Sequence, residues 1–321
     1  MKPINQSRYA IVFPGQGSQY VGMGLEIAKE FPSSKEIFEF AEQLTGLDIR
    51  GLTFFASQED LMETYVTQPC LLATSIAIYT IFQKAFPLIP EFICGHSAGE
   101  YAALVASGVV SFSDAITLIQ VRGTLMSKMQ KGSMVALKGV TLKEAKEICR
   151  KNVQQGGVLV PASLNSQEQV VISGDDNSVE AAIDFAIENN VKAVPLPVSG
   201  AFHSPLMQEA AQQFSHNIHN AHFHNATIPV ISNVTARPAI DGSEWMRLLE
   251  LQMTSTVHWE PSIRYIQEQG IEIFVEIGPG QVLSRLIRQI LPSALILNVE
   301  DIKSLQRTIS EMNKVVEAQT V

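Results

Sequence analysis

A serine flanked by two glycines stands between a short apolar segment and a helical pattern of small residues. Residues 92–104 read FICGHSAGEYAAL, and residues 95–99 match the pattern G-x-S-x-G. A tight strand-to-helix turn of this kind exposes the serine Oγ and aims a helix N-terminus at developing negative charge. An incidental serine in a glycine turn is the alternative. The setting between a strand and a helix favours Ser97 as a nucleophile.

A serine hydroxyl needs a base to remove its proton. His203 lies in VSGAFHSPLM, after an expected strand end and a glycine, and it follows Ser97 as the base does in hydrolase-type sites. A lone loop histidine is more often a surface residue, so both interpretations stay open here. His96 adjoins Ser97, but successive residues at such a turn point apart, which favours a structural role.

A glycine-rich stretch, PGQGSQYVGMG at residues 14–24, follows the first expected strand. It does not fit G-x-G-x-x-G, because Tyr20 occupies the place of the last glycine, so we do not expect a dinucleotide site. An oxyanion hole needs two donors from different segments. The backbone amides of Gln16 and Ala98 are the candidates.

An arginine, Arg122, lies near the end of an apolar helical pattern in LIQVRGTLM. Most arginines are surface residues or partners of a neighbouring carboxylate. An arginine beside a pocket instead holds a substrate carboxylate through two parallel hydrogen bonds. The residue pattern leaves both interpretations open.

Four histidines lie close together near a helix end: His216, His219, His222 and His224. A zinc site is the sharper interpretation of such a cluster. No cysteine is near, however, and the spacing matches no standard zinc pattern. A solvated helix face followed by a loop is favoured.

Strands alternate with helices along most of the chain, beginning with expected strands at 9–13 and 91–95. This alternation predicts an α/β fold with a mainly parallel sheet. The middle differs, because residues 132–199 show the order βαββαβ of a ferredoxin-like unit.

We therefore expect two subdomains. A large one is formed by residues 1–128 and 200–321, and a small ferredoxin-like one is inserted as residues 129–199.

Composition excludes several classes of protein. The 321 residues are 46% hydrophobic and 17% charged, and 32 acidic against 23 basic residues give a net charge of −9. This balance argues against general nucleic-acid binding. The three cysteines match no metal pattern, the N-terminus lacks a signal-peptide core, and the longest apolar run, 71–82, is too short to span a bilayer. We expect a soluble cytoplasmic protein with reduced thiols and no membrane partner.

Eight motifs follow one another along the chain: FPGQGSQYVGMG, TQP, GHSAGEYAAL, VRG, LNSQEQVVISG, GAFHS, SNVTA and EIGPG. In this order they resemble the malonyl-CoA:acyl carrier protein transacylases, including the free-standing acyltransferases of polyketide synthases. The resemblance covers about residues 9–290. It implies a hydrolase-like large subdomain, a ferredoxin-like small one, and an active site in the cleft between them.

The resemblance also implies a ping-pong acyl transfer. Ser97 attacks the thioester of malonyl-CoA with His203 as the base, and the amides of Gln16 and Ala98 hold the oxyanion. The phosphopantetheine thiol of an acyl carrier protein then takes the malonyl group. Arg122 matches the arginine that pairs with the malonyl carboxylate. No cofactor is implied, because malonyl-CoA is a co-substrate, and we expect a monomer.

Two further positions follow from the resemblance. Gln252 matches the glutamine whose main chain orients the histidine, so a Ser-His dyad without an acidic third member is expected. Phe202 matches the residue that disfavours an α-methyl group. Two departures stand out. Ala98 replaces a larger aliphatic residue, which leaves acyl-size selectivity open, and MTSTVHW, residues 253–259, lacks the usual Asn-Pro, which weakens the placement of Gln252.

Acyl carrier proteins are acidic, as this chain is, so docking requires a local basic patch. The candidates are Lys128, Lys131, Arg285 and Arg288. Whether the carrier serves fatty-acid or polyketide synthesis stays open.

Two rival functions remain. A thioester hydrolase would pass the acyl group to water, but it has no use for Arg122 when its acyl groups are uncharged. A docking protein that keeps only the fold would not need Ser97, His203 and Arg122 together.

Overall fold

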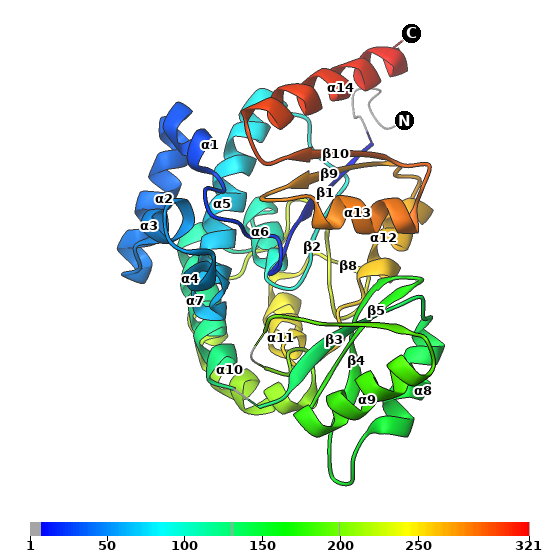
Figure 1. Cartoon of the computed structure of the whole chain (residues 1–321). Helices are drawn as coiled ribbons and strands as arrows, with labels where there is room; N and C mark the ends of the chain where they lie inside the picture. The colour runs from blue at the N-terminus through cyan, green and yellow to red at the C-terminus, as the bar shows by residue number, and fades with distance from the viewer. Residues whose placement is uncertain (1–7, 130, 199, 321) are drawn as a thin grey trace.

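The computed structural model describes residues 8–129, 131–198 and 200–320, and it places their strands in two sheets (Figure 1). The first sheet has the order β10-β9-β1-β2-β7-β8, and all its neighbours are parallel except β7 and β8. Its strands are β1 (Ala10–Phe13), β2 (Phe92–Gly95), β7 (Val230–Ile231), β8 (Pro238–Ala239), β9 (Ile273–Ile277) and β10 (Leu295–Val299). The predicted α/β class with a mainly parallel sheet is confirmed.

Strand β1 shows why the sheet is covered on both faces. All four of its residues are buried. Ile11 and Phe13 belong to one hydrophobic cluster and Ala10 and Val12 to another, as expected for side chains that alternate between faces. A strand with two apolar faces needs helices on both sides.

Most of the N-terminal helices pack in the cluster that contains Ile11 and Phe13, and α12 and α13 pack in the other. The helices outside the second sheet are α1 (Leu25–Glu30), α2 (Pro32–Thr45), α3 (Ile49–Phe54), α4 (Gln58–Met62), α5 (Thr64–Ala85), α6 (Gly99–Ala106), α7 (Phe112–Lys128), α10 (Gln208–Asn220), α11 (Gly242–Gln252), α12 (Trp259–Glu268), α13 (Val282–Ile290) and α14 (Ile302–Thr320), with a short 3-10 helix at Pro205–Met207.

The apolar helix is longer than the run of residues 71–82, so the expectation that it is too short to span a bilayer was wrong. α5 begins at Thr64 and contains Pro69, which the apolar run 71–82 leaves out. A proline usually ends a helical pattern, and Pro69, the sixth residue of α5, lacks the N–H that would bond the Tyr65 carbonyl; the helix nevertheless continues through it. By length and composition α5 could cross a membrane, yet 89% of its most apolar window is buried inside the protein. It is a core helix.

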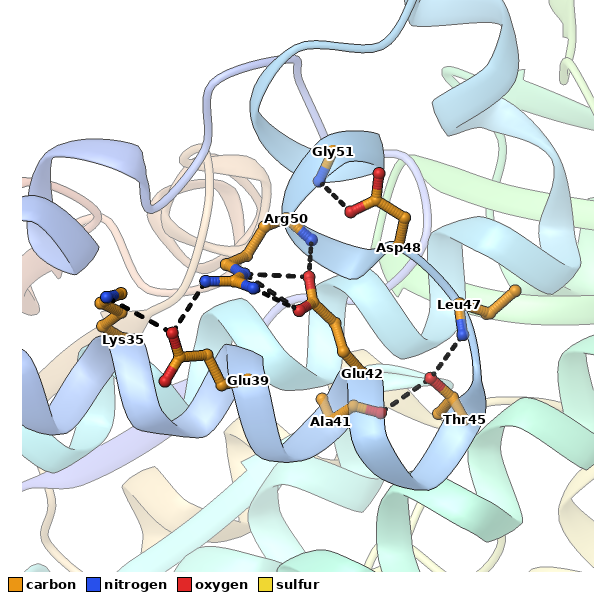
Figure 2. A network of polar contacts seen from close by, with 9 residues as sticks. All are labelled: Lys35, Glu39, Ala41, Glu42, Thr45, Leu47, Asp48, Arg50 and Gly51. Carbon is orange, nitrogen blue, oxygen red and sulfur yellow. Dashed lines mark hydrogen bonds and ion pairs between the residues drawn. The ribbon is translucent and has the colours of Figure 1, made fainter.

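A polar network joins α2 to the short α3, which the sequence did not predict (Figure 2). Arg50 donates to Glu39 and Glu42 of α2, and the Asp48 side chain caps α3 by accepting from the Gly51 N–H at 2.9 Å. The ion pairs are partly exposed, so each contributes at most about 1 kcal/mol. The network orients α3 more than it stabilises the fold.

The second sheet is antiparallel and has the order β4-β5-β3-β6. Its strands are β3 (Ser133–Lys138), β4 (Leu159–Ser166), β5 (Gln169–Gly174) and β6 (Lys192–Pro195), and its helices are α8 (Leu142–Asn152) and α9 (Asp176–Glu188). The element order βαββαβ agrees with the sequence pattern. The expected boundaries at 128/129 and 199/200 remain a prediction; residues 1–7, 130 and 199 lie outside the described residues.

The two sheets are joined through β4 and the segment before α12. Val257 donates to the carbonyl of Ala162, and Leu164 donates to the carbonyl of Val257. The Thr256 hydroxyl adds a bond to the Pro161 carbonyl at 2.7 Å. These bonds place the antiparallel sheet next to the large sheet (Figure 1).

Candidate active site

Ser97 sits in a tight turn between β2 and α6, as the sequence predicts. Its φ of 51° lies in the left-handed region, which a non-glycine residue adopts only when its surroundings hold it there. A Cβ at Gly95 would overlap the Gly99 backbone, and one at Gly99 would overlap the Phe13 carbonyl. The two glycines are therefore required by the close approach of these segments.

His203 lies beside this serine. Its Nε2 is 2.8 Å from Ser97 Oγ, and its Nδ1 is 2.9 Å from the carbonyl oxygen of Gln252. Because a carbonyl only accepts, Nδ1 carries the proton and Nε2 is left to accept from the serine hydroxyl. Burial, assisted by the charge of Arg122, lowers the pKa of His203 to about 3. The imidazole is therefore neutral at physiological pH, the form that can take a proton.

Arg122 is fully buried and touches the same serine oxygen. Its Nη2 donates to Ser97 Oγ at 3.1 Å, and its Nη1 donates to Gln68 Oε1 at 2.8 Å. Its Nε has no partner in the described part of the chain. A buried guanidinium with a donor to spare is suited to a carboxylate.

Two backbone amides belong to residues that line the cavity beside Ser97. Among the described residues, the N–H groups of Gln16 and Ala98 donate to no other group, and both residues line the cavity beside Ser97. Gly15 brings the two segments together, because a Cβ there would overlap the His96 carbonyl. The pair has the composition of an oxyanion hole.

The cavity has a volume of about 260 Å³ and opens between the two sheets. Gly15, Ser97 and Leu283 line it from the large sheet's side, and Met134 and Val171 line it from the antiparallel sheet. Ala98 and Phe202 also form part of the lining, as do Gln68, Met126, Leu196, Val198 and Leu286. Apart from its polar end at the serine, the cavity is largely apolar.

Gln252 does more than the sequence indicated. Besides the carbonyl bond to His203, its side-chain Nε2 donates to the Ser97 carbonyl at 3.1 Å and to Glu100 Oε2 at 2.6 Å. The missing Asn-Pro therefore does not move Gln252 away from His203.

Sequence reasoning assigned no role to Glu100 and Asn233. Glu100 accepts from the Asn233 N–H at 2.6 Å, and the Asn233 side chain accepts from the Ser97 N–H at 2.7 Å. A signal was present for Glu100, because it is the lone carboxylate in the apolar helix GEYAALVA. Gln68, which lies in the motif TQP, was also not predicted to have a role in the site.

The remaining histidines stay apart from the serine chemistry. The ring of His96 contacts Trp259, and its Nε2 lies 3.1 Å from Ser163 Oγ and 3.0 Å from Asn165 Oδ1. It joins the turn to β4, in keeping with the expected structural role. Of the distal cluster, His216 and His219 lie on α10. Among the described residues, no group of three or more His, Cys, Asp or Glu is arranged to hold a metal ion.

The four candidate docking residues Lys128, Lys131, Arg285 and Arg288 are exposed. Two of them lie on α13, which lines the cavity, and Lys128 ends α7 two residues after the lining residue Met126.

Comparison with known proteins matches residues 10–320 to the model of the acyl transferase domain. The malonyl CoA-acyl carrier protein transacylase of Bacillus subtilis is 38% identical over 96% of this chain and 99% of its own. The polyketide biosynthesis protein ThaF of Burkholderia thailandensis is 39% identical over 90% of this chain, but over only 25% of its own length.

Solved structures agree with this. The malonyl CoA-acyl carrier protein transacylase of Coxiella burnetii superimposes with a TM-score of 0.92 at 35% identity, covering 95% of this chain and 98% of that one. A malonyl-transacylase solved in complex with its type II polyketide synthase acyl-carrier protein gives a TM-score of 0.91 at 35% identity, covering 95% and 100%.

Proposed function

The chain belongs to the malonyl-CoA:acyl carrier protein transacylase family and is an acyltransferase, and we propose that it moves a malonyl group from malonyl-CoA to the phosphopantetheine thiol of an acyl carrier protein. One observation carries the proposal. A single oxygen, Ser97 Oγ, lies 2.8 Å from the unprotonated nitrogen of His203 and 3.1 Å from the buried guanidinium of Arg122. Malonyl-CoA is a co-substrate, and the reaction needs no resident cofactor.

In the first half-reaction Ser97 Oγ attacks the thioester carbonyl while His203 Nε2 takes the hydroxyl proton. The carbonyl oxygen becomes an oxyanion within reach of the free amides of Gln16 and Ala98. The C–S bond then breaks, and the coenzyme A thiolate leaves with the proton from the imidazolium. The product is a malonyl ester on Ser97.

The buried arginine selects the acyl group. A malonyl ester on Ser97 carries its free carboxylate beside the oxygen that Arg122 already touches. Burying that carboxylate without a partner would be unfavourable by several kcal/mol, so the guanidinium favours malonyl over uncharged acyl groups. Phe202, in the cavity wall, adds a limit on branched groups of about 1–3 kcal/mol for each methyl.

In the second half-reaction the carrier thiol attacks the ester and His203 again removes the proton. Away from the serine the cavity lining is largely apolar, which favours a bound acyl chain and carrier arm over water in that part of the cavity. Lys128, Lys131, Arg285 and Arg288 supply the local positive charge that an acidic carrier protein needs. The relatives include malonyl CoA-acyl carrier protein transacylases and a polyketide biosynthesis protein, so the carrier belongs to either fatty-acid or polyketide synthesis.

The proposal is tested by weighing the intact protein after incubation with malonyl-CoA. We expect a stoichiometric malonyl adduct on Ser97 and none on Ser97→Ala. Holo-carrier protein should then discharge the adduct and gain the malonyl mass. A Ser97→Ala variant that still becomes labelled would refute the nucleophile, and malonate released only as free acid would favour the hydrolase.

A further inference from the structure

We infer that Glu100 is a positioning residue for acyl transfer, whose carboxylate holds in place the side chains that fix both the nucleophile and its base. The inference rests on the proposed Ser-His chemistry and assigns a role to a residue that the mechanism above does not use.

Glu100 lies in the first turn of α6, and it is fully buried. Its Oε1 accepts from the backbone N–H of Asn233, and its Oε2 accepts from Nε2 of Gln252, both at 2.6 Å. Among the described residues, no Lys, Arg or His lies within ion-pair distance of this carboxylate. Two N–H donors therefore take the place of water around this buried carboxyl group.

The two donors lead directly to the backbone of the serine. The Asn233 side chain accepts from the Ser97 N–H at 2.7 Å and donates to the Gly95 carbonyl at 2.6 Å. The Gln252 side chain donates to the Ser97 carbonyl at 3.1 Å. Both polar backbone groups of a left-handed residue are thus held by partners of Glu100. Such a conformation persists only when its surroundings over-determine it.

The same network reaches the base. The backbone carbonyl of Gln252 accepts from Nδ1 of His203, while its side-chain amide lies between Glu100 and the Ser97 carbonyl. Both of these neighbours are acceptors, so only the amide nitrogen can face them. The other end of the amide, Gln252 Oε1, is buried without a partner. The carboxylate therefore specifies the orientation of Gln252 even though one polar atom stays unsatisfied.

The burial of Glu100 is better explained by a positioning role than by a contribution to stability. Burial raises the pKa of Glu100 to about 8, although both N–H donors and the charge of Arg122 act to lower it. A buried carboxylate without an ion-pair partner does not stabilise a fold relative to an apolar residue. Glu100 instead holds Asn233 and Gln252, whose side chains both bond the backbone of Ser97.

The test measures how fast, and to what final fraction, the protein reacts with a serine-reactive fluorophosphonate. The probe forms an O–P bond to Ser97 and expels fluoride as the hydroxyl proton leaves. The rate constant reports the geometry of the site, and the final fraction reports how much of the protein is folded. In Glu100→Gln one carboxylate oxygen becomes an NH₂ donor that faces another donor. We expect the labelling rate constant to fall about 10- to 100-fold, while the fraction of protein finally labelled stays close to that of the wild type.

Three further variants complete the experiment. Glu100→Asp keeps two acceptor oxygens and should recover part of the rate. Gln252→Met keeps the backbone carbonyl for His203 but removes the amide, so it should be slow in the same way even if Glu100→Gln folds poorly. Thr308→Val is the matched control, because it removes a buried hydroxyl that bonds the Asn298 carbonyl and lines no part of the cavity.

A rate constant for Glu100→Gln within twofold of wild type would overturn the inference. So would a reduced labelled fraction with an unchanged rate constant, which is the signature of a purely structural residue. The probe carries no malonyl group, which keeps the two proposals separable. If wild-type Ser97 does not react with it, the proposed nucleophile fails; if it reacts with the probe but not with malonyl-CoA, only the acyl specificity fails.

Discussion

At the scale of single residues, the serine oxygen lies between a neutral base and a permanent cation. Burial lowers the pKa of His203, and the guanidinium of Arg122 lowers it further because it disfavours a second positive charge nearby. A substrate carboxylate bound to Arg122 offsets that charge. In the proposed mechanism, the same contact therefore selects the acyl group and eases proton transfer to the base.

We expect Arg122→Ala to lose malonyl transfer far more than acetyl transfer. Removing one partner of a buried charge pair is unfavourable by about 3–5 kcal/mol, or more than 100-fold, and acetyl carries no carboxylate to be left unpaired. The measurement is kcat/KM for malonyl-CoA and acetyl-CoA with each enzyme. Arg122→Lys serves as the control, because it keeps the charge but not the fork. Equal losses for the two substrates would contradict carboxylate pairing.

The pH dependence of acylation should lack the usual histidine limb. The base is active when neutral, and the pKa of His203 lies near 3 rather than 6.5, so the active form persists as the pH falls. We expect the single-turnover rate of Ser97 acylation to show no step near pH 6.5; a step near pH 8 would belong to Glu100, whose pKa burial raises to about 8. Mass spectrometry of rapidly quenched samples measures it. A fall with an apparent pKa near 6.5 would show that His203 is more solvated than the structure has it.

At the scale of elements, the site depends on two loops that touch at Gly15. A side chain there would overlap the His96 carbonyl, so Gly15→Ala must push the Gln16 amide away from the serine turn. We expect a destabilisation of about 1–3 kcal/mol and a slower acylation step. Denaturant unfolding and single-turnover labelling measure the two effects.

A matched control for this variant is Gly46→Ala. Gly46 ends α2 at a φ of 69° with open space around it. Alanine there should destabilise by about 1 kcal/mol through backbone strain alone and leave acylation unchanged. If Gly46→Ala slowed acylation as much as Gly15→Ala, general destabilisation would explain both.

The sequence predicts those features of the site whose residues are close together in the chain, and it does not predict contacts between residues far apart in the chain. β2, the turn and α6 are continuous in the chain, so their pattern predicts the nucleophile's setting. α3 has only six residues and an internal glycine, and its ends are fixed by a cap and by Arg50, so periodicity could not reveal it. The Glu100–Asn233 bond joins residues 133 apart. This bond forms because β7 pairs with β2, and no pattern within a short stretch of sequence predicts that pairing.

At the scale of the whole molecule, the cavity has one wall from each sheet, so the contacts between the sheets should control substrate binding. Asn165 Oδ1 accepts from Ser163 and lies 3.0 Å from His96 Nε2, which ties β4 to the serine turn. We expect Asn165→Ala to destabilise the protein by about 1–3 kcal/mol, because it leaves a buried polar group unpaired. The KM for malonyl-CoA should rise as the second wall loosens.

Hydrogen exchange locates that loosening, because the amides of Leu164 and Val257 bond across the junction between the sheets. Both should exchange faster in Asn165→Ala. Asn165 itself lines the cavity, whereas Thr256, which bonds the Pro161 carbonyl in the same junction, does not. A rise in KM in Thr256→Val can therefore come only through the wall. If exchange at the junction increases in both variants while KM stays at the wild-type value, the two sheets do not act together in holding the substrate.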